Sequence, residues 1–146
     1  MIAVFDIDGV LADATHRQHH LAARPKDWDA FFGEVGADPV IEAGVRRYLE
    51  EATRHEVVLM SGRPERTRRD TREWLTRNGL GEPRMILRED ADFRPAAVVK
   101  SELKAAGFVL EAESAVLRNP ADPRTATSNN PPVPTDKFAL RFMKPR

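Results

Sequence analysis

The chain has 146 residues, about the length of one domain with a single hydrophobic core. Its 23 basic residues balance 23 acidic residues, so net charge gives no argument for a nucleic acid or a membrane as partner. The absence of cysteine excludes disulfides, zinc–thiolate sites and cysteine nucleophiles. No apolar run approaches the roughly 18 residues of a membrane span, and the first residues lead into acidic ones without a signal-peptide pattern. These features predict a soluble, cytoplasmic domain.

Short apolar blocks alternate with helix-like stretches over the first hundred residues. The blocks, which have the character of buried strands, are residues 2–5, 57–60 and 85–87. The stretches that favour helices are about 40–53, 64–78 and 95–106. Strands that alternate with helices predict an α/β fold with a parallel central sheet and helices on both faces.

Residues 11–39 interrupt this alternation directly after the first strand. An insertion at this place lies over the carboxyl end of the strand, where α/β sheets bind ligands. We therefore expect either a small cap, with a short helix beginning near Pro25 or Asp27, or an ordinary packed segment. The segment also holds three histidines, and His16 and His20 are spaced to share a helix face. Two ligands without a nearby third are a weak zinc signal, so ordinary surface or packing histidines are the expected reading.

The composition changes after residue 114. Five prolines and two consecutive asparagines between residues 119 and 134 predict an extended loop. A strand is expected to begin near residue 108, and residues 137–143 alternate like a closing strand. We divide the chain into a core over residues 1–114, a proline-rich loop over 115–136, and a closing strand and tail over 137–146.

Residues 5–13 (FDIDGVLAD) carry the strongest chemical signal. Asp6 and Asp8 follow a buried strand one residue apart, where the chain turns at Gly9. Like charges this close are unfavourable unless a cation neutralises them, and Mg²⁺ is the natural partner because it takes oxygen ligands. One carboxylate then suits nucleophilic attack on phosphorus, and the other suits proton transfer. The plain alternative is an acidic turn that caps a helix.

This stretch resembles the first motif of the haloacid dehalogenase-like (HAD) phosphohydrolase superfamily. The resemblance implies a three-layer Rossmann-like fold in which Asp6 is the nucleophile and Asp8 the general acid/base. It implies that Ser61, after the strand at 57–60, hydrogen-bonds the transferring phosphoryl group. It also implies a lysine that offsets the charge of phosphate and carboxylates. Lys100 matches this position, with Lys104 as the fallback; taken alone, either lysine reads as a surface residue.

Within the superfamily, the chain most resembles the phosphatase domain of polynucleotide kinase-phosphatases. The stretches that carry the resemblance are residues 61–63 (SGR), 72–75 (REWL), 85–88 (MILR) and 98–100 (VVK). That family removes 3′-phosphates from nucleic acid ends. The resemblance implies that Arg63 contacts phosphate, and we place Gly62 and Arg66 with it in substrate binding.

The predicted helix after Arg63 is rich in charge. From residue 63 to residue 77 there are six arginines against three acidic residues. Such an excess suits contacts with the phosphates of a polyanion. Mixed charge on a helix is also typical of a solvated face with ion pairs one turn apart, and this alternative stays open.

The superfamily's fourth motif, an Asp pair that completes the Mg²⁺ site, has no match here. Residues 108–114 (FVLEAES) offer Glu111 and Glu113 instead. Both are oxygen donors, although their longer side chains would shift the ion. Asp122, in the proline-rich segment, is a poorer candidate. Alternating glutamates on an edge strand are otherwise typical of its solvent face.

From about Ala96 onward, the chain also resembles the end of predicted Rossmann-type methyltransferases, in which the last two strands are antiparallel. This implies a C-terminal antiparallel hairpin and makes both Lys100 and the completeness of the metal site less certain. It implies no methyltransferase activity, because the glycine-rich cofactor loop is missing from the N-terminal part.

These observations give three hypotheses for function. The first is an Mg²⁺-dependent phosphatase acting through an aspartyl-phosphate on the 3′-phosphate ends of nucleic acid, nucleotides or small phosphomonoesters. The second is a phosphate- or nucleic-acid-binding module on the same scaffold, impaired in catalysis by the missing acid pair. A methyltransferase-like function is third. No membrane partner is expected, and the oligomeric state does not follow from the sequence.

Overall fold

The computed structural model describes residues 2–22, 24–92, 109–114 and 139–143, the last two ranges as backbone. Its five strands form one sheet in the order β3-β2-β1-β5-β4. The strands are β1 (Ile2–Phe5), β2 (Glu56–Pro64), β3 (Arg84–Arg88), β4 (Val109–Ser114) and β5 (Ala139–Met143). The helices are α1 (Trp28–Gly33), α2 (Glu42–Ala52) and α3 (Arg68–Arg77), with 3₁₀ turns η1 (Thr15–Leu21), η2 (Val35–Ala37) and η3 (Glu65–Thr67). No helix in these ranges is long and apolar enough to cross a membrane.

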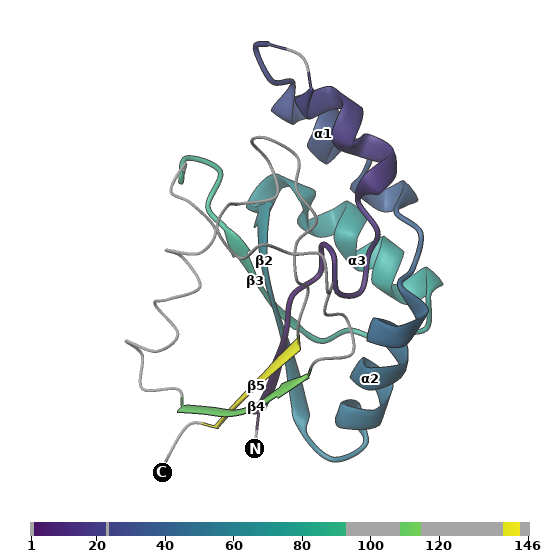
Figure 1. Cartoon of the computed structure of the whole chain (residues 1–146), viewed down its shortest axis with the longest axis vertical. Helices are drawn as coiled ribbons and strands as arrows, with labels where there is room; N and C mark the ends of the chain where they lie inside the picture. The colour runs from purple at the N-terminus through teal and green to yellow at the C-terminus, as the bar shows by residue number, and fades with distance from the viewer. Residues whose placement is uncertain (1, 23, 93–108, 115–138, 144–146) are drawn as a thin grey trace.

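The predicted α/β architecture is confirmed, with a parallel unit at its centre. β1 pairs in parallel with β2, and β2 pairs in parallel with β3. Helices α2 and α3 lie on the same side of this unit in Figure 1. The helix expected at about 95–106, which would supply the third layer, lies outside the described residues.

The two C-terminal strands extend the sheet through antiparallel pairing. β5 pairs antiparallel with β1, and β4 pairs antiparallel with β5, as the expected C-terminal hairpin requires. β4 therefore runs in the same direction as β1, but β5 lies between them. The proline-rich loop that joins β4 to β5 falls outside the described residues.

Apolar residues of the strands and of two helices form the main core. From the sheet come Phe5, Leu59 and Met85, and from α3 come Trp74 and Leu75, all of them buried. The core thus fixes α3 against β1 and β2, the strands whose carboxyl ends carry the motif residues.

The turn after β1 is tight and closely packed. The carbonyl of Ile7 accepts hydrogen bonds from the three amides of residues 10–12 at 2.9 to 3.2 Å. Gly9 has a φ of 79°, a region that favours glycine. A Cβ at Gly44 of α2 would lie 1.7 Å from the carbonyl oxygen of Val10, so only glycine allows α2 to approach the turn this closely. Helix and turn therefore hold Asp8 in a fixed place.

The insertion after β1 forms a closed unit above the sheet. Its two ends lie side by side, because Ala12 bridges Val40 and the amide of Asp13 donates to the carbonyl of Pro39 at 2.8 Å. Between them, η1, α1 and η2 gather beyond the carboxyl ends of the strands (Figure 1). Asp27 caps α1 by accepting a hydrogen bond from the amide of Ala30 at 2.9 Å, as its position in the sequence suggested. We call residues 11–39 the cap.

Candidate functional site

The carboxyl ends of β1 and β2 bring together most of the residues singled out in the motifs. Phe5 pairs with Leu59, so Asp6 and Ser61 follow within two positions of each other on adjacent strands. β2 continues through residues 61–64 instead of ending at Met60, because these residues still pair toward β3 after a register shift. Asp6 is half-buried and accepts a hydrogen bond from the amide of Ile7 at 2.8 Å.

Two arginines hold Asp8. Its Oδ1 accepts hydrogen bonds from Nη2 of Arg17 at 2.7 Å and from Nε and Nη2 of Arg63 at 3.0 and 2.7 Å. Arg17 comes from the cap and Arg63 from β2, and both side chains are fully buried. The Asp8 side chain keeps 28% of its surface exposed. Asp8 therefore lies where a buried cluster of charge meets solvent.

Asp38 is the second carboxylate of this cluster. Its side chain is fully buried, and its Oδ2 accepts from Nη2 of Arg17 at 3.0 Å and of Arg63 at 2.6 Å. Its Oδ1 accepts from Nε of Arg17 at 2.8 Å and lies 2.8 Å from Nε2 of His16. Two carboxylates and two guanidinium groups thus balance in a site where an unpaired charge would be strongly unfavourable. We call Asp8, Arg17, Asp38 and Arg63 the buried charge cluster.

Helix α3 supports this cluster from its inner face. Nη1 of Arg63 donates to Oγ1 of Thr71 at 3.1 Å, and Nε1 of Trp74 donates to the carbonyl of Asp38 at 2.6 Å. The guanidinium of Arg17 also stacks on the ring of Phe31 in the cap, with 4.2 Å between Cζ and the ring centroid. The forked donors of arginine suit this arrangement, because each one must reach two carboxylates at once.

Ser61, Gly62 and Arg66 have different surroundings. Ser61 is buried, and its Oγ accepts a hydrogen bond from the amide of Arg63 at 3.3 Å. Gly62 is half-buried between them. Arg66 is 43% exposed and ties the cap to the sheet, because its side chain contacts Asp29 at 2.9 Å while its amide donates to Asp90 at 2.9 Å. Of the three predicted substrate-binding residues, Arg63 is the most deeply enclosed.

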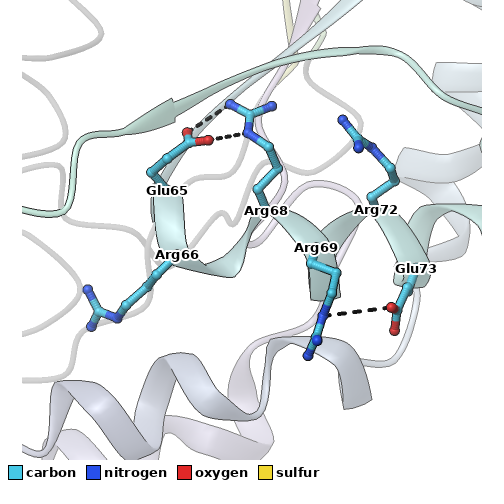
Figure 2. A pocket seen from close by; sticks show the side chains of 6 residues that line it. All are labelled: Glu65, Arg66, Arg68, Arg69, Arg72 and Glu73. Atoms are coloured by element: carbon cyan, nitrogen blue, oxygen red, sulfur yellow. Dashed lines mark hydrogen bonds and ion pairs between the residues drawn. The ribbon is translucent and has the colours of Figure 1, made fainter.

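The charged helix shows an outer surface with its own ion pairs (Figure 2). A shallow hollow of about 520 Å³ is lined by Glu65, Arg66, Arg68, Arg69, Arg72 and Glu73. Glu65 binds Arg68, and this contact lowers the pKa of the Glu65 carboxyl below its ordinary value. Arg69 lies 3.8 Å from Glu73. In the described part of the chain Arg72 forms no ion pair. The surface therefore has both features expected from the sequence: arginines paired with acidic residues, and an arginine that could contact a phosphate.

The remaining predicted site residues lie apart from Asp6 and Asp8 or outside the described residues. Lys100, Lys104 and Asp122 fall in ranges that the structure does not describe. Glu113 pairs with Leu140 of β5, which in turn pairs with Val4 of β1. Glu111 lies at the register shift of the same strand, β4. Two strand spacings of about 4.8 Å therefore separate the backbone of both glutamates from β1.

The oxygen donors near Asp6 fit part of an Mg²⁺ site. The carboxylate of Asp6 and the backbone carbonyl of Asp8 are hard donors at one strand end, and Mg²⁺ commonly takes few protein ligands together with water and substrate phosphate. Ligands of one such ion must lie within about 2.1 Å of it. Because β5 separates β4 from β1, the assignment of Glu111 and Glu113 as further ligands stays a prediction.

Arg17 and Asp38 were not predicted as site residues from the sequence. Both lie in the cap, and no sequence spacing distinguishes one buried arginine among the 23 basic residues. Their partners are distant in sequence: Asp38 lies 21 positions from Arg17 and 25 from Arg63. Only the fold brings them together.

Comparison with known proteins gives one family and one fold. The model of the family described as the polynucleotide kinase PNKP phosphatase domain matches residues 1–108. A solved structure of a Pnkp1/Rnl/Hen1 complex is similar at 22% identity and a TM-score of 0.57, over 71% of this chain and 33% of the other. A structure of the Pnkp1/Rnl/Hen1 RNA repair complex gives 22% and 0.55, over 72% and 31%. The chain thus spans about a third of the length of these structures.

The other comparisons add little. None of the curated proteins matches the chain. The likeness of the C-terminal part to the end of a methyltransferase has no support among the matches, since the family match ends at residue 108 and the structural likeness at this identity concerns the fold alone.

Proposed function

Because the chain belongs to the family of polynucleotide kinase PNKP phosphatase domains, we propose that it is a HAD-type phosphatase that acts on the 3′-phosphate ends of nucleic acid. The observation that carries this proposal is the placement of Asp8. Its Oδ1 is held by two buried arginines at the strand end that also carries Asp6. Nucleotides and small phosphomonoesters are the next substrates to consider.

In the proposed reaction, a carboxylate oxygen of Asp6 attacks phosphorus in line. The bond from phosphorus to the ester oxygen breaks, and Asp8 gives a proton to that oxygen as it leaves. Water then attacks the aspartyl-phosphate while Asp8 takes its proton, which releases phosphate and restores the Asp6 carboxylate. Within the described residues, Oδ2 of Asp8 has no hydrogen-bond partner, whereas Oδ1 accepts three bonds. We therefore assign the proton transfer to Oδ2, the oxygen that the arginines leave open.

Arg17 and Arg63 supply the positive charge for the phosphoryl group. In the structure their N–H groups are directed at Asp8 and Asp38, and a phosphate dianion would compete with Asp8 for the same donors. Because both guanidinium groups are already fixed by Asp38, they need little reorganisation when substrate binds, and such preorganisation is a main source of catalysis. Ser61 supports the oxygens of the same group.

A bound Mg²⁺ would neutralise charge shared by the phosphate and Asp6. The Asp6 carboxylate and the Asp8 carbonyl are the donors that we assign to it, with Glu111 or Glu113 as the further candidates. Lys100 is proposed to offset the remaining negative charge. The backbone separation of β4 from β1 favours the second candidate function, a binding module with impaired catalysis, because among the described residues it places the backbone of Glu111 and Glu113 two strands away from β1.

The proposal is tested by hydrolysis of 3′-phosphorylated RNA and DNA oligonucleotides and of an aryl phosphate, with and without Mg²⁺. We expect metal-dependent release of phosphate that disappears in Asp6→Asn, with a higher kcat/KM for oligonucleotides than for the aryl phosphate. Asp70→Asn, which changes a carboxylate on the outer part of α3, is the matched control and should keep full activity. Tight binding of the oligonucleotides by a folded protein without turnover would instead support the binding module.

A further inference from the structure

Three side chains of the cap have no part in the proposed reaction and lie close together. His19 and His20 are consecutive in η1, and Glu34 follows α1. One possible ligand atom from each lies within 4.8 Å of the other two. The cap thus supplies a third ligand, 14 positions from His20, that the spacing of the histidines did not reveal.

The hydrogen bonds of these residues orient them as ligands. Nδ1 of His19 lies 2.9 Å from the backbone carbonyl of His16, and a carbonyl can only accept, so Nδ1 carries the proton and Nε2 keeps its lone pair. Histidine ligands of metals commonly donate their other N–H to a carbonyl in this way. Nε2 of His20 lies 3.0 Å from Oε1 of Glu34.

We propose that His19, His20 and Glu34 bind a divalent transition-metal ion, of which Zn²⁺ is the preferred example, in the cap. Two imidazoles and one carboxylate suit Zn²⁺, whereas Mg²⁺ prefers oxygen ligands throughout. Metal–ligand distances of about 2.0 to 2.2 Å require the three atoms to close slightly, and Glu34 to exchange its hydrogen bond from His20 for the ion. The ring centroids of His19 and His20 lie 3.8 Å apart, and His19 is exposed whereas His20 is partly buried.

The site lies beside the buried charge cluster without being part of it. Oε2 of Glu34 is 3.6 Å from Nδ1 of His16, and Nε2 of His16 contacts Asp38. An ion held by Glu34 would fasten η1 to the segment after α1, the two parts of the cap from which Arg17 and Asp38 come. The expected result is a cap that is more stable with the ion than without it.

The test is calorimetric titration of the full, chelator-treated chain with Zn²⁺, in parallel with thermal unfolding. We expect one ion per chain, a rise of Tm with Zn²⁺, and affinity at least about tenfold weaker in His19→Ala and in Glu34→Gln. Absorption of bound Co²⁺ should show nitrogen ligands in the wild type and lose intensity in both variants. An excess of Mg²⁺ should not displace the ion.

The matched control is His55→Ala. His55 also lies near a glutamate, with 3.5 Å between its Nε2 and Oε2 of Glu51, but the described residues give this pair no third ligand. Zn²⁺ binding should be unchanged in this variant. No stoichiometric binding by the wild type, or binding that survives both His19→Ala and Glu34→Gln, would overturn the proposal. Because the titration needs no substrate, its outcome is independent of the phosphatase assay.

Discussion

The two faces of α3 make different kinds of contact: the inner face supports buried charges, and the outer face carries exposed ion pairs. On the inner face, Thr71 and Trp74 are buried and hold Arg63 and the backbone of Asp38. On the outer face, Arg69 and Glu73 are exposed, and they pair one turn apart along the helix itself (Figure 2). The inner contacts join α3 to other elements, with Trp74 and Asp38 36 positions apart, whereas the outer pair lies within the helix. We therefore expect substitutions on the inner side to affect both stability and the site, and those on the outer side to affect neither strongly.

The largest effect is expected at Asp38, on which the inner side depends. Asp38→Asn leaves two buried guanidinium groups with one carboxylate, and breaking a buried ion pair in this way costs about 3 to 5 kcal/mol. Urea unfolding followed by circular dichroism measures it. Asp29→Asn, at an exposed carboxylate that pairs with Arg66, should change the free energy of unfolding by less than about 1 kcal/mol. Equal effects of the two substitutions would remove the distinction between buried and exposed pairs.

Trp74→Phe tests the inner face of the helix directly. The substitution keeps an aromatic ring but removes the donor to the carbonyl of Asp38, and a buried acceptor left without a partner costs about 1 to 3 kcal/mol. The same unfolding measurement applies. Trp28→Phe is the control, since Trp28 is 43% exposed in the cap. The comparison would fail if Trp74→Phe were as mild as Trp28→Phe.

Arg69→Gln on the outer face should change the free energy of unfolding by no more than about 0.5 kcal/mol, because exposed ion pairs contribute little. Phosphatase activity on an aryl phosphate should be unchanged, since this side chain lies on the face of α3 opposite Thr71 and Trp74. A decrease in the free energy of unfolding of more than about 1 kcal/mol, measured in the same urea titration, would show that the outer ion pairs stabilise the fold.

The smallest effect concerns the titration of Glu65. Its hydrogen bond from Arg68 lowers the pKa of the carboxyl below the ordinary value, so the pair contributes stability above that ordinary pKa and loses it as the pH falls through the lowered one. Carboxyl chemical shifts measured by NMR should follow the lowered pKa in the wild type. In Arg68→Gln the pKa should return toward the ordinary value, and the difference in Tm between the two proteins should shrink in acid. An unchanged pKa in the variant would contradict the assigned cause.

Much of the fold was predictable because it depends on local patterns. The apolar runs at residues 2–5 and 85–87 predicted β1 and β3 to within one residue at each end, although β3 is only partly buried. The helix predicted from residue 64 begins instead with a 3₁₀ turn, because β2 continues to Pro64. Glycine and proline near strand ends do not show where pairing stops.

The candidate site was predictable only in its motif residues. Asp6, Asp8 and Arg63 stand in recognisable local sequences, and the fold brings them to adjacent strand ends. Arg17 and Asp38 were not predicted, because burial of a charged side chain depends on partners that the chain supplies 9 to 25 positions away. The same reasoning applies to Glu34, whose neighbours come from another part of the cap. The assignments of Lys100, Glu111 and Glu113 stay predictions.

The closure of the cap on itself has a consequence for how this architecture can vary. Ala12 and Val40, at the two ends of the cap, already lie side by side. A very short connection between them would therefore be enough to lead the chain from β1 to α2. The backbone geometry would therefore allow the cap to be shortened or exchanged. In electrostatic terms it cannot be replaced so freely, since it supplies Arg17 and Asp38, and the buried Arg63 pairs with Asp38 as well as with Asp8. A shorter or exchanged cap would have to return one positive and one negative charge to the same place, whatever else it changed.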